Sequence, residues 1–218
     1  GSSGLRIINI TSPSQPVLLG SLPTTHAQGV AVDGCIAYVA DWTGGLRVIN
    51  VTDPRQPTLL GSLATTNAIR VAVAGHIAYV ADGTSGLRII NVTNPRQPTL
   101  LATLDTDMAL DVCVAGESVY LADYGPGLRV INVTNPRQPT LLGTLDTDYA
   151  RGVAVAGHIA CIADDSSGLR VINVTNPRQP TLLGTIGTTG AQGVALDGAL
   201  AYVADYFDGL RVINITDP

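Results

Sequence analysis

Short apolar runs, each bounded by Gly, Pro, Asn or Asp, recur along the whole chain. In one stretch they cover residues 150–156, 159–163, 169–174 and 181–186, with turn-forming residues between them. Runs of five to seven residues with this punctuation predict β-strands rather than helices. The pattern therefore predicts groups of four short strands.

The pattern repeats every 41 residues without an insertion. Gly-Leu-Arg begins at residues 4, 45, 86, 127, 168 and 209. An Asp recurs at the same step, as Asp41, Asp82, Asp123, Asp164 and Asp205. Four strands in about 40 residues is the size of one β-propeller blade. A solenoid is the competing geometry, but it needs distinct capping repeats, which the sequence does not show.

The two ends of the chain carry complementary parts of one unit. Residues 5–10 and 17–22 have the pattern of a third and a fourth strand. Residues 194–196, 200–204 and 210–215 have that of a first, second and third strand. Because ring closure removes exposed sheet edges, we predict that strands from both termini share one closing blade.

The predicted fold is thus an all-β, five-bladed β-propeller in a single domain, residues 1–218. Its blades are residues 26–63, 67–104, 108–145, 149–186, and a closing blade of 190–218 plus 1–22. One third strand is left over, either residues 4–10 or 209–215. This surplus favours a monomer with a redundant end and leaves a strand-swapped dimer open.

Composition supports an all-β chain and narrows the class of partner. The basic residues are all Arg, and the acidic residues are all Asp except one Glu, Glu117. Lys and Glu favour helices, so their near absence supports strands. The net charge of −5, without a basic run, argues against nucleic acid, which needs clustered positive charge. No apolar stretch approaches the ~20 residues of a membrane span, and no secretory signal is evident.

Two segments of the repeat carry a family resemblance. Residues 86–95 read Gly-Leu-Arg-Ile-Ile-Asn-Val-Thr-Asn-Pro, and residues 73–82 read Val-Ala-Gly-His-Ile-Ala-Tyr-Val-Ala-Asp. This unit resembles the LVIVD-repeat family of β-propellers. One departure is systematic, because Asn stands where Asp is common in that family, at Asn9, Asn50, Asn91, Asn132, Asn173 and Asn214. The resemblance implies the fold and an extracellular or cell-surface location in a prokaryote, but no particular activity.

The connections between strands emerge on two faces, and the repeats differ on only one of them. The third-to-fourth connection reads Thr-Asn-Pro-Arg-Gln-Pro at 93–98, 134–139 and 175–180. The connections after the second and fourth strands differ from repeat to repeat. We call the surface that they form the varied face, and the opposite surface the uniform face. Loops on a rigid frame commonly carry binding residues, so the varied face is the predicted binding surface.

Aromatic residues and Arg, which commonly anchor interfaces, gather on the varied face. The predicted partner-binding residues are His26, Trp42, Arg70, Asp111, Tyr124, Tyr149, Arg151, Tyr206 and Phe207. The partner stays open between a protein, a peptide and a glycan. Two alternatives also stay open. One is an amplified or designed scaffold without a ligand, and the other is a glycosidase-like enzyme using carboxylates such as Asp111 and Asp148.

The remaining candidate groups favour structural roles. Each repeated Asp ends a strand before a turn, where its side chain can bind backbone N–H groups, with the Arg of Gly-Leu-Arg as a partner. Glycoside hydrolysis needs two carboxylates in different environments, whereas these Asp share the same neighbours. The histidines lie on opposite faces or distant repeats, and the three cysteines share no spacing. We therefore expect no catalytic residue, cofactor or metal.

Overall fold

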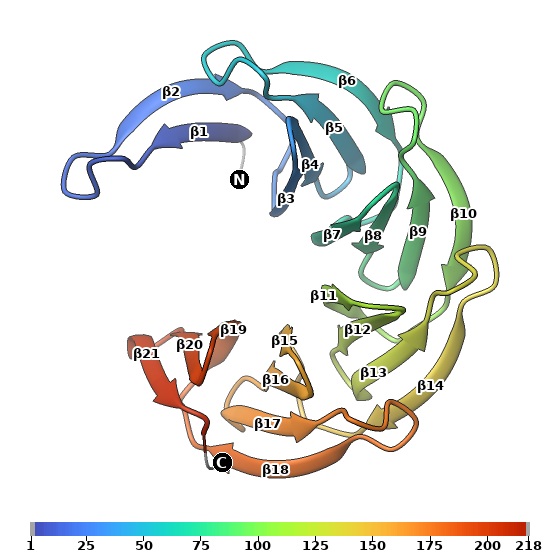
Figure 1. Cartoon of the computed structure of the whole chain (residues 1–218), viewed down its shortest axis with the longest axis vertical. Helices are drawn as coiled ribbons and strands as arrows, with labels where there is room; N and C mark the ends of the chain where they lie inside the picture. The colour runs from blue at the N-terminus through green and yellow to red at the C-terminus, as the bar shows by residue number, and fades with distance from the viewer. Residues whose placement is uncertain (1–2, 217–218) are drawn as a thin grey trace.

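The computed structural model describes residues 3–216, and every regular element in that range is a β-strand. The strands form sheets that stand side by side around a central axis (Figure 1). In each complete sheet the first strand lies nearest the axis and the fourth lies at the rim. This is the blade arrangement of a β-propeller.

Four sheets are complete antiparallel meanders, with their strands in chain order. The first contains β3 (Gly29–Asp33), β4 (Ile36–Ala40), β5 (Leu46–Asn50) and β6 (Thr58–Leu63). The second contains β7 (Arg70–Ala74), β8 (Ile77–Ala81), β9 (Leu87–Asn91) and β10 (Thr99–Leu104). The third contains β11 (Ala109–Ala115), β12 (Ser118–Asp123), β13 (Gly127–Asn132) and β14 (Thr140–Leu145). The fourth contains β15 (Gly152–Ala156), β16 (Ile159–Ala163), β17 (Leu169–Asn173) and β18 (Thr181–Ile186).

Two incomplete sheets flank these four. At the N-terminal end, β1 (Leu5–Asn9) pairs with β2 (Val17–Leu22). At the C-terminal end, β19 (Ala191–Asp197), β20 (Leu200–Asp205) and β21 (Gly209–Asn214) form a three-stranded sheet. By their place in the repeat, β1 and β2 are a third and a fourth strand, and β19 to β21 are a first, second and third strand.

The predicted strand pattern is confirmed. Residues 159–163 and 181–186, predicted as a second and a fourth strand, are β16 and β18. Second and third strands lie between sheets and are covered on both faces, which explains their nearly continuous apolar sequence. The fourth strand lies at the rim, where its side chains are exposed or half-buried.

Apolar side chains between neighbouring sheets form the core, with one cluster at each junction. At the junction of the second and third complete sheets, Leu87 and Ile89 pack with Leu121 and Ile131, all fully buried. Burial of one such side chain contributes about 1.5–3 kcal/mol. Packing between sheets, rather than pairing within them, therefore sets how neighbouring blades are angled.

Backbone bridges reinforce three of the four junctions that follow the complete sheets. Trp42 and Ala68, in adjacent sheets, exchange N–H···O bonds of 2.9 and 3.1 Å. Gly83 with Ala109, and Asp165 with Ala191, form the same bridge. The equivalent residue at the remaining junction, Tyr124, donates instead to the carbonyl of Met108 in its own sheet, at 3.0 Å.

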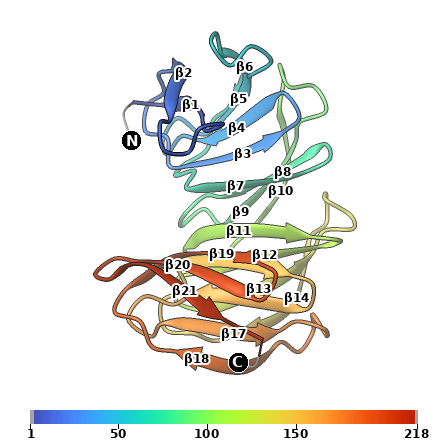
Figure 2. The same ribbon diagram turned by 60° about the vertical axis from the view of Figure 1, so that its left-hand side comes forward.

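The predicted closing blade is not formed. Within residues 3–216, β1 and β2 pair only with each other, and the β19–β21 sheet is separate. An opening in the ring separates these sheets (Figure 1), and the turned view in Figure 2 shows them at opposite ends of the molecule. Residues 1–2 and 217–218 of the predicted blade lie outside the described residues. The physical reason is the junction packing, which angles successive sheets so that the two ends stay apart.

Candidate functional site

A buried Asp in each repeat fixes the loops of the varied face. In the second complete sheet, Asp82 accepts hydrogen bonds from the backbone N–H groups of Thr66 (3.1 Å) and Asn67 (2.8 Å). Its carboxylate also accepts a bond of 3.0 Å from Nε of Arg88. The predicted Asp–Arg pairing and the predicted bonding to backbone N–H groups are both present; that these N–H groups belong to the loop before the first strand was not predicted. Each Asp thus ties the loop before a first strand to the turn after a second strand.

The hydrogen bonds of this Asp also set its charge state. Burial of Asp41 favours the protonated acid. Hydrogen bonds that include those from the backbone of Thr25 and His26 and from Arg47 outweigh burial and hold the pKa of Asp41 below its ordinary value. The group is therefore an ionised structural anchor at neutral pH.

Several predicted residues meet where the third and fourth complete sheets adjoin. The rings of Tyr124 and Tyr149 lie 5.2 Å apart, centroid to centroid, at an interplanar angle of 44°. The guanidinium carbon of Arg151 lies 5.3 Å from the centroid of the Tyr124 ring, in cation–π range. Nε of Arg151 also donates to Oδ2 of Asp165 at 2.6 Å. The guanidinium is thus held between an aromatic ring and a carboxylate.

A surface hollow of about 280 Å³ begins at this Arg–Asp pair and extends to the β19–β21 sheet. It is lined by Arg151, Asp165, Gly190, Gln192, Tyr206 and Phe207. Tyr206 and Phe207 are 75% and 72% exposed, and their rings meet edge to face with centroids 5.0 Å apart. Two large aromatic side chains thus stand largely in solvent beside charged and amide groups.

Glycine at position 190 keeps this hollow open. A Cβ atom there would lie 3.2 Å from Cβ of Tyr206 and 3.3 Å from the ring of Phe207. The equivalent residues of the other repeats are His26, Asn67, Met108 and Tyr149, all of which carry side chains. The hollow is therefore specific to this part of the ring.

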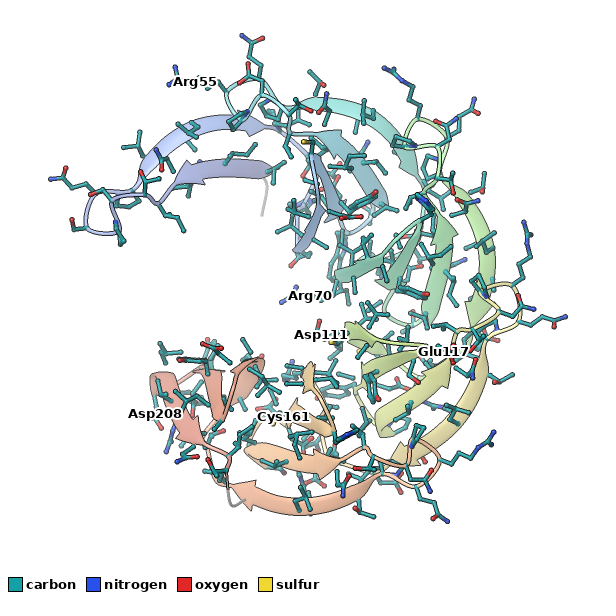
Figure 3. All side chains as sticks on the ribbon, in the orientation of Figure 1. Arg55, Arg70, Asp111, Glu117, Cys161 and Asp208 are labelled. Atoms are coloured by element: carbon teal, nitrogen blue, oxygen red, sulfur yellow. The ribbon has the colours of Figure 1, made fainter. Side chains whose placement is uncertain are left out.

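Two further predicted residues, Arg70 and Asp111, lie apart from the hollow and point into the central opening (Figure 3). Nη1 of Arg70 donates to the carbonyl of Gln28 at 2.9 Å, and its Nε lies 4.0 Å from Oδ1 of Asp111. The Asp111 carboxylate accepts the N–H groups of Val112 (2.9 Å) and Val153 (3.0 Å). These contacts connect inner strands of successive sheets across the wall of the opening.

Burial governs the protonation of Asp111. It raises the pKa of this carboxyl above its ordinary value, although the N–H groups of Val153 and Val112 and the charge of Arg70 act in the opposite direction. The ionised form of Asp111 is therefore less favoured than that of an ordinary exposed aspartate.

The last two predicted residues, His26 and Trp42, belong to the other arm of the ring. Both lie on connections of the first complete sheet, with two complete sheets between them and the fourth. Trp42 is 38% exposed. It has a left-handed backbone, φ 49°, where the next repeat has Gly83 at φ 57°. His26 and Trp42 therefore lie apart from both aromatic pairs, Tyr124 with Tyr149 and Tyr206 with Phe207.

Three residues of the hollow, Asp165, Gly190 and Gln192, are absent from the predicted site. All three stand at positions that differ between repeats, so variation alone could have found them. The prediction rested on aromatic and basic anchors, whereas these residues contribute polar groups or, for Gly190, the absence of a side chain.

Among residues 3–216, no three His, Cys, Asp or Glu side chains converge as they would around a metal ion. The same residues contain no helix of the length and hydropathy that crossing a membrane requires. Burial raises the pKa of the Cys161 thiol to about 12, as suits a packing residue rather than a nucleophile.

Fold and repeat together define a protein of the β-propeller type. The LVIVD repeat pattern matches residues 1–24, 25–65, 66–106, 108–147, 148–188 and 190–218. The chain therefore belongs to the LVIVD-repeat family. No curated protein matches it.

Solved structures share the fold at low sequence identity. A protein of unknown function from Desulfotomaculum acetoxidans has a TM-score of 0.82 and 13% identity, covering 99% of this chain and 77% of its own. A Bacteroides uniformis protein described as a candidate 6-phosphogluconolactonase has a TM-score of 0.81 and 14% identity, covering 97% and 74%. The computationally designed protein Ika8 has a TM-score of 0.73 and 12% identity; the match covers 91% of this chain and only 62% of Ika8. These likenesses show the fold alone.

Proposed function

We propose that the chain is a non-catalytic binding module that engages its partner at the hollow between β15–β18 and β19–β21. One observation carries the proposal. Tyr206 and Phe207 hold two aromatic rings, 75% and 72% exposed, at the edge of a hollow that also contains a paired Arg and Asp. Exposed aromatic side chains beside oriented polar groups are typical of recognition surfaces.

The chemistry of the hollow favours a ligand with an apolar face and a polar edge. The rings offer stacking surface, while Gln192 and Asp165 offer hydrogen-bonding groups. A volume of about 280 Å³ is at the small end of ligand sites, so it suits a sugar unit or a few residues of a peptide or protein partner. The chain's net charge of −5 and the carboxylate in the hollow disfavour nucleic acid.

Backbone strain supports a broader binding role for the varied face. A left-handed backbone costs a bulky residue on the order of 1–2 kcal/mol, and Gly83 makes the same turn in the next repeat without that cost. Trp42 has a large, partly exposed ring despite the conformational strain of this backbone. A scaffold selected for stability alone would favour glycine there.

The carboxylates of the varied face support binding rather than hydrolysis. Asp111 accepts two backbone N–H groups with its two oxygens. Oδ2 of Asp148 accepts bonds from Oγ of Ser167 (2.5 Å) and Nη2 of Arg170 (2.9 Å). A glycosidase needs one carboxyl free to donate a proton and another free to act as base or nucleophile. Asp111 instead joins inner strands of neighbouring sheets, and Asp148 is paired with Ser167 and Arg170.

The proposal is tested with glycan and peptide arrays, followed by titration calorimetry of any hit. Tyr206→Ala and Phe207→Ala should each raise the Kd about fivefold or more, because aromatic anchors commonly contribute over 1 kcal/mol. Arg96→Ala and Arg137→Ala are the matched controls, since both residues belong to the connections of the uniform face. Their equivalent Arg55 points outward from the rim in Figure 3.

Three outcomes contradict the proposal. If the control substitutions weaken binding as much as those at the hollow, the partner uses the uniform face. If neither array gives a hit, the alternative of a scaffold without a ligand is favoured. Turnover of a glycan that is lost in Asp111→Asn and Asp148→Asn would favour the enzymatic alternative.

A further inference from the structure

The edge of β1 that faces away from β2 has no strand beside it within the described residues. In every complete sheet that edge of the third strand pairs with a second strand, as β5 pairs with β4. The side chains of β1 are more exposed than their equivalents as a result. Ile8 is 50% exposed, whereas its equivalents Ile90, Ile131 and Ile172 are fully buried.

The neighbouring sheet shows the shape of the unfilled position. Val30 in β3 is 54% exposed, while Val71, Val112 and Val153 at the same step of the repeat are 7%, 6% and 5% exposed. The residue type and strand position are the same, so the difference lies in what covers them. Val112 packs in one cluster with Tyr79 and Ala81 of β8, the second strand of the preceding sheet. The sheet of β1 and β2 lacks that strand.

This unfilled position, which we call the β1 slot, is bounded by Ile8, Val30 and Val32. Val32 is 63% exposed, so the slot presents three branched apolar side chains to solvent. The four complete repeats define what fills such a slot: the first and second strands of an LVIVD repeat. The occupant must therefore be a two-stranded hairpin of that sequence.

The other end of the chain carries such a hairpin in β19 and β20. Among residues 3–216 their sheet has no fourth strand, and its third strand β21 is exposed at Leu210 (70%) and Val212 (57%). The sequence of β1, Leu-Arg-Ile-Ile-Asn, differs from Leu-Arg-Val-Ile-Asn of β21 at one residue. Thus β1 can take the place of β21 beside β20, and β2 then supplies the missing fourth strand.

We infer that the β1 slot receives β19 and β20 of a second copy of this chain, with β1 replacing β21 of that copy. The hairpin of the same chain is held across the opening by packing of β19 on β15 and β16. Bringing it to β1 would require repacking the junctions around the ring. A second copy docks as a rigid body and gives up only one edge strand.

The register between β1 and β20 of the second copy follows from the β20–β21 pair. Ala201 lies opposite Ile213, and Leu200 opposite Asn214, in the β20–β21 pair. With β1 in place of β21, Ile8 of one copy lies opposite Ala201 of the other. The contact joins two different surfaces, so two copies close into a dimer if the exchange is reciprocal, and longer chains form if it is not.

Disulfide trapping between two differently tagged chains tests this register. Cys35, Cys113 and Cys161 are first replaced by Ala; one chain then carries Ile8→Cys and the other Ala201→Cys. A cross-linked heterodimer under mild oxidation is expected. The matched control replaces Ala201→Cys with Ala160→Cys, the equivalent position of a complete sheet, where Ile172 already lies opposite. Only background cross-linking is expected for it.

Two results of the trapping experiment overturn the inference. One is a heterodimer yield no greater than that of the Ala160→Cys control. The other is a chain carrying both Ile8→Cys and Ala201→Cys that cross-links internally at monomer mass, because the ring then closes on itself.

A second measurement does not depend on cysteine chemistry. Light scattering across the micromolar range should show a self-association that Val30→Lys weakens about tenfold or more, since the equivalent Val71, Val112 and Val153 are buried and the charge would be buried likewise.

Leu141→Lys is the control for the light-scattering measurement. Leu141 is 44% exposed on the outer strand β14, away from the slot, so its substitution should leave self-association unchanged. A monomeric mass for the unsubstituted chain at all concentrations, or equal effects of the two lysines, overturns the inference.

Discussion

Replacing the buried Asp of a central blade measures how much the repeated Asp–Arg contact contributes to the fold. In Asp82→Asn one oxygen becomes an amide NH₂ group, which cannot accept a hydrogen bond. In the unsubstituted protein the Asp82 carboxylate accepts hydrogen bonds from the N–H groups of Thr66 and Asn67 and from Nε of Arg88, at 3.1, 2.8 and 3.0 Å. At least one of these donors therefore loses its acceptor, and Arg88 loses its counter-ion.

The structure allows an estimate of the cost. Removing one partner of a fully buried ion pair costs about 3–5 kcal/mol, and a hydrogen bond to a charged group contributes about 1.5–3 kcal/mol. The Asp82 side chain is 0% exposed but that of Arg88 is 23% exposed. Water can therefore partly solvate the abandoned guanidinium. We expect Asp82→Asn to lower the free energy of unfolding by about 2–4 kcal/mol.

Urea unfolding followed by circular dichroism and by fluorescence of the single Trp measures this loss. The two signals must coincide before a two-state free energy is taken, because repeat proteins can unfold in parts. The control Asp197→Asn removes an exposed carboxylate and should change stability by less than about 0.5 kcal/mol. A double-mutant cycle with Arg88→Leu should give a coupling of about 1–3 kcal/mol. The reasoning is refuted if Asp82→Asn costs no more than its control.

Three further predictions concern single residues. The pKa of Asp41 is lowered in the folded state, so its contribution is present above pH ~4 and is lost as pH falls through the folded-state pKa; unfolding free energies that stay flat from pH 5 to pH 3 would contradict this. Trp42→Gly should raise stability by about 1 kcal/mol, because Gly83 shows that the left-handed turn suits glycine; a loss measured by urea unfolding would show that the ring packs productively. Gly190→Tyr, which introduces the residue that the preceding repeat has at Tyr149, should fill the hollow and abolish ligand binding while far-UV circular dichroism is unchanged, and retained affinity would place the ligand elsewhere.

The repeat made the blades predictable from sequence. Period, strand limits and the pairing of Asp82 with Arg88 all follow from local signals that recur 41 residues apart. Closure of the ring does not follow from such signals. It depends on the angle between neighbouring sheets, which arises from the summed packing of side chains such as Ile89 and Leu121. The ends of the chain are complementary in sequence, yet that angle keeps them apart.

The candidate site was predictable by face but not by residue. Strand order predicts that Trp42 and Phe207 lie on equivalent connections, and they do follow β4 and β20, the second strands of their sheets. Sequence could not show that they lie on different arms of the ring, since position along the ring depends on the number and angle of sheets. Nor could it show that Gly190 leaves room beside Phe207, because a hollow is created by what a residue lacks.

The missing backbone bridge at Tyr124 gives one joint of the ring a different mechanical character. Each of the other three junctions after complete sheets is held by an exchange of backbone hydrogen bonds. At this junction the contact between the tilted rings of Tyr124 and Tyr149, and the hydrogen bond from the N–H of Val153 to Asp111, take the place of that exchange. The rigidity of this junction thus depends on side chains. Substituting them can change the angle at this junction, and with it the width of the opening in the ring, while the backbone hydrogen bonds of the other junctions are kept.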